Sequence, residues 1–318
     1  MKQMTSSCRQ KWKRIGLIYP NREKDDWDSG VGAPHMVVME DRVRMYYHGM
    51  IKGIYQIGFA DASFSDLTRW EPCASNPVLT IGPPGAIDSR WAGYPWIVRQ
   101  STSQWTLYYA TFDGTLSDHG NLKVWQTSTA ESRDGGLTWN RSGRPILDRG
   151  EPGTIDSCGT GSCCVIPAAH PGHSKEWYMY YTAVDRGIDW YRISVGLAIS
   201  RDGGVTFCRH PNGTALQVPP KLGCPGSTCS KPFVLFDGER YRMWFSCAQD
   251  GIHYRIHYAE ADDGIHFRWN PEPVLDVADR GWDNEMTCYP SVFTVNRRTY
   301  MAYTGNEYSG IGLAERVS

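Results

Sequence analysis

A short motif that recurs along the chain constrains its fold more than any other feature. Residues 132–139 and 200–207 both fit the pattern Ser-x-Asp-Gly-Gly-x-Thr-aromatic, and they begin 68 residues apart. Weaker copies lie at residues 66–70 and 263–267. Self-similarity at a fixed period indicates a protein built from stacked units, each of which buries its apolar face against its neighbours.

A second marker accompanies this motif. An apolar residue followed closely by aromatic residues recurs in five runs, at residues 45–47, 107–109, 179–181, 243–245 and, less perfectly, 301–303. A segment rich in Val, Ile and Pro precedes each aromatic run. In most units the aromatic run is followed by a segment of small residues, then by the turn motif and a short outer segment. Four short strands per unit, repeated radially, describe the blades of a β-propeller.

The repeats therefore predict an all-β chain that forms one domain over residues 1–318, a five-bladed β-propeller. The last unit stops without a turn motif or a fourth strand, whereas the segment at 12–19 resembles the fourth-strand segments of other units. We expect this N-terminal strand to complete the last blade and leave no long sheet edge open. The predicted blades span residues of about 27–80, 87–148, 155–218, 224–276, and 283–316 together with 12–19.

Charge and hydropathy exclude several kinds of partner. The chain has 33 basic and 34 acidic side chains, so its net charge of -1 gives no field that attracts nucleic acid or an anionic membrane. It shows neither a long apolar run nor a secretory signal. We expect a soluble, cytoplasmic protein whose partner is a small molecule or a sugar.

An aspartate enters the first strand of most units. Asp28, Asp88, Asp156 and Asp283 hold this position, while the fourth unit has the segment 224–231, which ends in Lys231 and places a cation near the rim. One mouth of a propeller channel collects these loops, and crowded carboxylates split their pKa values so that one serves as acid and another as base. The alternative is a repeated cap, in which each carboxylate accepts hydrogen bonds from its own loop.

Further polar residues are expected around the same mouth. Aromatic and amide side chains there suit sugar rings, and Arg90 and Lys231 suit a ligand carboxylate or phosphate, or else pair with nearby acids. His35 either carries protons or fills a polar pore. No cofactor or dedicated metal site is indicated, although converging oxygens would suit a structural calcium. The remaining candidates for substrate binding are His48, Asp113, Asp185, Trp190, Asn306 and Glu307.

With its five units, its turn motifs and the Pro-Ser-Val run at 290–292, the chain resembles the five-bladed propeller glycosidases of the arabinanase, levansucrase and invertase superfamily. The turns are similar to the Asp-boxes of sialidases. The resemblance implies an acid from the first blade as nucleophile or base, one from the second as transition-state stabiliser, and a Glu from the third as proton donor. The third inner strand has no Glu, and Ala33 stands where a family aspartate is often found.

We therefore predict a glycoside- or glycan-active, hydrolase-like enzyme. Asp28 is the expected base or nucleophile and Asp88 the orienting acid, with Asp156 or Glu285 as proton donor. The absent Glu favours one alternative, a cyclase, isomerase or lyase that moves protons on a small metabolite without attack by water. The other alternative is a non-catalytic carbohydrate-binding module.

Overall fold

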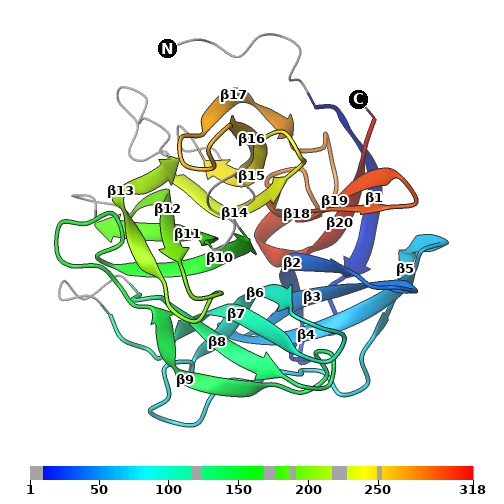
Figure 1. The fold of residues 1–318 in the computed structure, drawn as a ribbon. Coiled ribbons are helices and arrows are strands. Elements are labelled where there is room, and N and C mark those ends of the chain that lie inside the picture. Colours follow the sequence, from blue (N-terminus) through cyan, green and yellow to red (C-terminus); the bar gives the residue numbers. More distant parts are fainter. Residues whose placement is uncertain are drawn as a thin grey trace.

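The computed structural model describes residues 10–116, 123–167, 176–186, 191–216, 228–248 and 253–317. Strands account for nearly all of the regular structure, and the helical element within these ranges is a single 3-10 turn, η2 (Asn306–Tyr308). The all-β prediction is therefore confirmed (Figure 1). No helix in the described ranges is long and apolar enough to cross a membrane.

The strands form antiparallel sets of four, which follow one another along the chain. The first two sets belong to one eight-stranded sheet, in which a single parallel pair, Tyr55 with Trp91, connects them. The first set contains β2 (Gly30–Val38), β3 (Arg42–Ile51), β4 (Ile54–Ser63) and β5 (Asp66–Pro72). The second set contains β6 (Trp91–Arg99), β7 (Trp105–Phe112), β8 (Gln126–Ser132) and β9 (Asn140–Leu147).

Three further sets are separate four-stranded sheets. The third set contains β10 (Gly159–Pro167), β11 (Trp177–Arg186), β12 (Tyr191–Ser200) and β13 (Cys208–Leu216). The fourth set contains β14 (Thr228–Phe236), β15 (Tyr241–Ala248), β16 (Arg255–Ala261) and β17 (Arg268–Leu275). The fifth set contains β18 (Cys288–Val295), β19 (Arg298–Thr304), β20 (Gly310–Arg316) and the N-terminal strand β1 (Trp12–Pro20).

The first strand of each set lies toward the middle of the molecule. Strands β2, β6, β10, β14 and β18 contact one another in that order, and β18 also contacts β2. Figure 1 shows these five strands gathered centrally, with the later strands of each set farther out. The five strands therefore bring distant parts of the sequence to a common region.

The aromatic runs join neighbouring sets. The hydroxyl groups of Tyr46, Tyr108 and Tyr180 donate hydrogen bonds to the backbone carbonyls of Gly136, Gly204 and Gly264, at 2.9, 3.2 and 2.7 Å. Each glycine belongs to the turn motif of the following set. Because these tyrosines are fully buried, the hydrogen bond satisfies a hydroxyl that would otherwise be costly to bury.

Strand β1 lies far in sequence from the strand with which it pairs. It runs antiparallel to β20, in a register that extends from Trp12 with Arg316 to Pro20 with Gly310. It also contacts two other sets. The Trp12 ring lies 6.4 Å from Trp244 in the fourth set, and Tyr19 shares a 2.9 Å hydrogen bond with Tyr47 in the first.

Candidate functional site

The four aspartates predicted at the entering loops lie in equivalent surroundings. Each is at most 4% exposed. Each accepts a hydrogen bond from a tyrosine hydroxyl on the second strand of its own set. The pairs are Asp28 with Tyr47 (3.0 Å), Asp88 with Tyr109 (3.0 Å), Asp156 with Tyr181 (2.8 Å) and Asp283 with Tyr303 (2.9 Å).

Three of these carboxylates also hold an arginine from the outermost strand of their set. Arg141 pairs with Asp88 at 2.8 Å, Arg209 with Asp156 at 2.6 Å and Arg14 with Asp283 at 2.8 Å. The same guanidinium groups donate to the backbone carbonyls of Thr80, Asp148 and Asp276. Each ion pair thus ties an entering loop to the outer edge of its sheet.

Asp28 differs from the other three. Arg141 follows Trp139 by two residues, whereas Pro72 follows Trp70 by two residues in the first set, so no guanidinium group stands at the equivalent position of its outer strand. Burial raises the pKa of Asp28, and the hydrogen bond from Tyr47 opposes that shift. The protonated form of Asp28 is therefore more favoured in the folded protein than in the unfolded chain.

The fourth set lacks two parts of this arrangement. Phe245 occupies the position of the tyrosine that binds the aspartate, and Trp269 occupies that of the arginine. The sequence predicts no aspartate in this unit, whose entering loop lies outside the described residues. An aromatic-x-Arg pattern in the outer strands is the sequence signal from which these ion pairs could have been predicted.

These contacts bear on the predicted carboxylate cluster. Among the described residues, the hydrogen bonds and ion pairs of the four aspartates join no two of them to each other. Each is instead bonded to side chains from other strands, a tyrosine in all four cases and an arginine in three, rather than to the backbone of its own loop as the repeated-cap interpretation expects. The catalytic roles of Asp28, Asp88 and Asp156 remain predictions.

The predicted residues near the last entering loop are mostly structural or exposed. Asn306 accepts hydrogen bonds at 2.9 Å from the backbone N–H groups of both Glu285 and Met286. The side chains of Glu285 and Glu307 are exposed, and the Glu285 carbonyl accepts a hydrogen bond from Arg255. The proton-donor role of Glu285 and the substrate-binding roles of Asn306 and Glu307 stay predictions.

The predicted residues near the second and third loops are dispersed. Arg90 and Asp113 are exposed, and Asp113 accepts a 2.7 Å hydrogen bond from the backbone of Thr115. Asp185 pairs with Arg192 at 2.6 Å and accepts a hydrogen bond from Ser157. Trp190 lies outside the described residues.

A bulge recurs at the same place in all five central strands. Two residues of the central strand oppose one residue of its partner there, and the first of the two has a φ between 43° and 56°, a conformation that L-residues rarely adopt. Proline follows it in four strands, and none of these five residues is acidic. They are Ala33, Tyr94, Ser162, Lys231 and Tyr289.

Two bulge tyrosines form an aromatic cup with Tyr308. The Tyr308 hydroxyl lies 2.7 Å from that of Tyr94 and 3.4 Å from that of Tyr289. His48 contacts this cup, because its ring lies 4.7 Å from Tyr94 and 5.1 Å from Tyr308, and its Nδ1 accepts a hydrogen bond from the Tyr94 backbone. Tyr94 and Tyr308 are partly exposed, so the cup reaches solvent.

Lys231 lies in the interior, so its predicted place near the rim is wrong. The bulge begins at this residue and carries it into the middle of β14, where it is 3% exposed. Its Nζ donates to the Pro34 carbonyl of β2 at 3.4 Å. Burial lowers the pKa of Lys231 to about 8.

His35 and His48 lie near this lysine. Burial, reinforced by the Lys231 charge, lowers the pKa of both histidines to about 3, so both rings are neutral. Nδ1 of His35 and Nε2 of His48 are buried and have no hydrogen-bond partner among the described residues. The structure thus brings three of the predicted binding residues together.

Within the described ranges, no group of three or more His, Cys, Asp or Glu side chains is placed to hold a metal ion.

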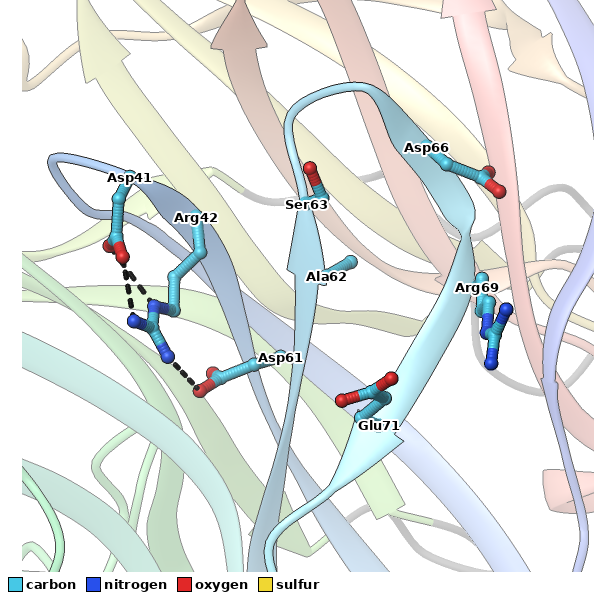
Figure 2. A pocket seen from close by; sticks show the side chains of 8 residues that line it. All are labelled: Asp41, Arg42, Asp61, Ala62, Ser63, Asp66, Arg69 and Glu71. Atoms are coloured by element: carbon cyan, nitrogen blue, oxygen red, sulfur yellow. Dashed lines mark hydrogen bonds and ion pairs between the residues drawn. The ribbon is translucent and has the colours of Figure 1, made fainter.

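A groove of about 430 Å³ lies on the outer strands of the first set. Asp41, Arg42 and Asp61 line one side of it, and Figure 2 shows Arg42 between the two aspartates. The Arg42 guanidinium is 2.6 Å from Asp41 and 3.5 Å from Asp61. Arg44 also pairs with Asp61, at 2.8 Å, so two arginines balance the two aspartates on this side of the groove.

Comparison with known proteins places the chain in a family. No protein-family model matches it. The uncharacterized protein Rv1502 of Mycobacterium tuberculosis is 39% identical over 315 residues, which cover 95% of this chain and 98% of that protein. The chain belongs to the Rv1502 family. A second member, the uncharacterized protein MT1551 of the same species, matches with the same identity and coverage.

Solved structures with the same fold include glycoside hydrolases. A structure of BT0996 in an RGII complex has a TM-score of 0.77 at 16% identity and covers 96% of this chain and 92% of that one. A GH130 structure, from work on glycoside hydrolases that target β-1,2 mannosidic linkages in Candida mannan, has a TM-score of 0.70 at 14% identity, with coverages of 98% and 95%. A thermostable family-43 glycoside hydrolase has a TM-score of 0.68 at 14% identity, with coverages of 90% and 89%. At these identities the likeness concerns the fold, and the Rv1502 family shares it.

Proposed function

We propose that this protein is a carbohydrate-active, five-bladed β-propeller of one domain that binds a saccharide at its centre. The five sets of strands and the mutual contacts of their first strands support the blade count. The pairing of β1 with β20 supports closure of the ring. The glycoside hydrolases that share the fold support a sugar ligand.

The aromatic cup of Tyr94, Tyr289 and Tyr308 is the observation that carries the proposal. Binding sites for small molecules are mostly lined by aromatic and apolar groups, with a few polar groups that fix orientation. The tyrosine rings offer flat faces to the C–H groups of a sugar, and the clustered hydroxyls offer donors and acceptors to its hydroxyls. Met286 and Tyr254 extend the same cluster.

Among the described residues, the bulge positions at this centre supply no carboxyl group for a two-carboxylate hydrolase. Such enzymes place two carboxyl groups about 5 to 9.5 Å apart on either side of the scissile bond. The five bulge residues include no acid, and the nearby buried aspartates are already bonded to tyrosine and arginine. We therefore favour Asp88 and Asp156 as anchors of their loops.

Lys231 favours a second candidate function, a lyase or isomerase that acts on the bound saccharide. An amine whose pKa is about 8 is partly neutral near physiological pH and can take a proton from carbon, and a tyrosine hydroxyl can return one to oxygen. Turnover in heavy-oxygen water separates the two chemistries. Hydrolysis incorporates the label into the product, whereas elimination or isomerisation does not.

Binding measured on a glycan array and then by calorimetry tests the proposed function. Y94F and Y308F each delete one hydroxyl of the cup, and we expect each to weaken binding of the selected glycan by about twofold to tenfold, the range for one lost hydrogen bond. Y300F is the matched control, because Tyr300 is a buried tyrosine of β19 outside the cup. Equal affinity in all three variants, or an array without any bound glycan, would contradict the proposal.

A further inference from the structure

Lys231 carries a buried charge for which the described residues provide no opposite charge. Of these residues, two cations outside the histidines are buried, Arg44 and Lys231. Arg44 forms an ion pair with Asp61 at 2.8 Å. By contrast, the groups that act electrostatically on Lys231 are thiols, those of Cys163, Cys164 and Cys288.

Two neutral imidazoles face the same ammonium group. His35 lies on β2, next to the Pro34 carbonyl that Nζ contacts, and His48 lies on β3. Both rings retain a buried nitrogen without a partner among the described residues. A neutral imidazole nitrogen donates or accepts according to its tautomer, so these two groups suit a polar ligand.

This arrangement is costly in the free protein. A buried charge without a partner is strongly unfavourable, as is a buried polar atom without a hydrogen bond. Three such groups, on β2, β3 and β14, have no counter-charge or no hydrogen-bond partner among the described residues, and they mark a site that an anionic ligand would complete. His48 also contacts Tyr94 and Tyr308, so this polar group adjoins the aromatic cup.

We propose that the saccharide bound at the centre is anionic and that its negative group, a carboxylate or a phosphate, pairs with Lys231 beside His35 and His48. This inference rests on the proposed function, since the cup holds the sugar ring and the lysine selects the charged substituent. A compact ammonium group suits either anion, because it acts as a point charge without a demand for planar geometry.

Paired ligands test the charge requirement on the wild-type protein. Glucuronic acid is compared with glucose, galacturonic acid with galactose, and glucose 6-phosphate with glucose, by calorimetry at pH 7 and low salt. We expect at least one anionic sugar to bind ten times or more tightly than its neutral counterpart, and the pair that responds identifies carboxylate or phosphate. Equal affinity within every pair overturns this inference and leaves the proposed function standing, whereas failure of every probe to bind counts against both.

The variant K231M removes the charge and keeps the length of the side chain. We expect it to bind the preferred anionic sugar at least tenfold more weakly and to reduce the anionic-to-neutral preference to about one. K52M is the matched control, because Lys52 is also a lysine with positive φ, 50° against 43°, but is exposed. Unchanged preference in K231M overturns the inference.

Thermal stability separates a ligand-binding lysine from a structural one. If the role of Lys231 is to bind the ligand, ligand-free K231M melts at the same temperature as the wild type or higher, because the substitution removes an unpaired buried charge. The anionic sugar raises the melting temperature of the wild type and not that of K231M. A large fall in the melting temperature of free K231M would show that the lysine stabilises the fold itself, and would overturn the inference.

Discussion

A buried carboxylate persists where hydrogen bonds and counter-charge offset its loss of hydration, and the entering-loop aspartates differ in how they meet this condition. Asp88 and Asp156 each hold an arginine that is about one-third exposed or less. We expect D88N and D156N to lower the free energy of unfolding by about 1 to 2 kcal/mol, because each leaves that arginine without its charged partner. Urea denaturation of the two variants and the wild type measures this difference in the free energy of unfolding.

Asp28 is the internal control for that prediction. No arginine of its outer strand pairs with it, and burial raises its pKa, so its charged form is less favoured in the folded protein than in the unfolded chain. A raised pKa means that this group's contribution to stability falls as pH rises from 3.8 through the folded-state pKa. D28N removes this penalty, and we expect it to cost less stability at pH 7 than D88N or D156N. A loss as large as theirs would count against the role given to the arginines.

The sequence predicts the positions of the aspartates, and the aromatic-x-Arg pattern marks the arginines, but which aspartate each arginine pairs with depends on the fold. Asp88 and Arg141 are 53 residues apart, and only the folded order of the strands brings them together. The same holds for His35, His48 and Lys231, which the sequence offered as separate candidates. The sequence interpretation took the segment 224–231 as an entering loop, whereas its residues from Thr228 to Lys231 already belong to the central strand β14.

At the scale of single elements, the turn motif connects one set to the next through its second glycine. Gly136 has a φ of 82°, and a Cβ there would overlap the Tyr46 hydroxyl and the Trp105 ring. Gly203, which is the first glycine of the next copy, has a similar φ of 78°, but a Cβ there would meet nothing within 4 Å. We expect G136A to lower the melting temperature by several degrees more than G203A, since both substitutions share the backbone strain. Similar losses would show that φ alone determines the cost.

The aspartate of the same motif should respond to pH. Hydrogen bonds from Thr206 and Ser200 lower the pKa of Asp202 to about 2. A lowered pKa means that the stabilisation is present above the unfolded value of 3.8 and is lost as pH falls toward 2. We expect D202N to melt below the wild type at pH 6, and the difference to narrow between pH 4 and pH 2. A difference that stays constant over this range would contradict the assignment.

The strands themselves were largely predictable from the sequence. The strand order within each set follows from alternating runs and Gly-rich turns, which act locally. In the first three aromatic runs, however, the two tyrosines bond in different directions: the first bonds to the next set, as Tyr46 does, and the second to the entering loop of its own set, as Tyr47 does. Successive residues of a strand point to opposite faces of the sheet, and which face meets which neighbour depends on the fold. The aromatic pattern therefore predicted the strands but not the hydrogen-bond partners of their tyrosines.

For the whole molecule, β1 determines how the two ends of the chain meet. It pairs with β20, its Arg14 holds Asp283 of the fifth set, and its Tyr19 reaches Tyr47 of the first. Gln10, just before it, accepts a 3.0 Å hydrogen bond from Trp244 of the fourth set. A single short segment thus contacts three sets. Its loss would leave β20 as an open sheet edge and would remove a hydrogen-bond or ion-pair partner from Asp283, Tyr47 and Trp244.

Complementation in trans is expected from this arrangement. A chain that begins at Asn21 should be markedly less stable and prone to aggregate, because β20 loses its partner along the whole register from Trp12 to Pro20. A synthetic peptide of residues 10–20 should bind this chain and raise its melting temperature in proportion to the logarithm of peptide concentration. The matched control is the same peptide with Arg14→Met and Tyr19→Phe, which keeps the backbone pairing but loses the contacts to Asp283 and Tyr47 and should bind more weakly. If the truncated chain is as stable as the full one, or if both peptides act alike, β1 is an appendage of β20 and the ring is held closed by other contacts.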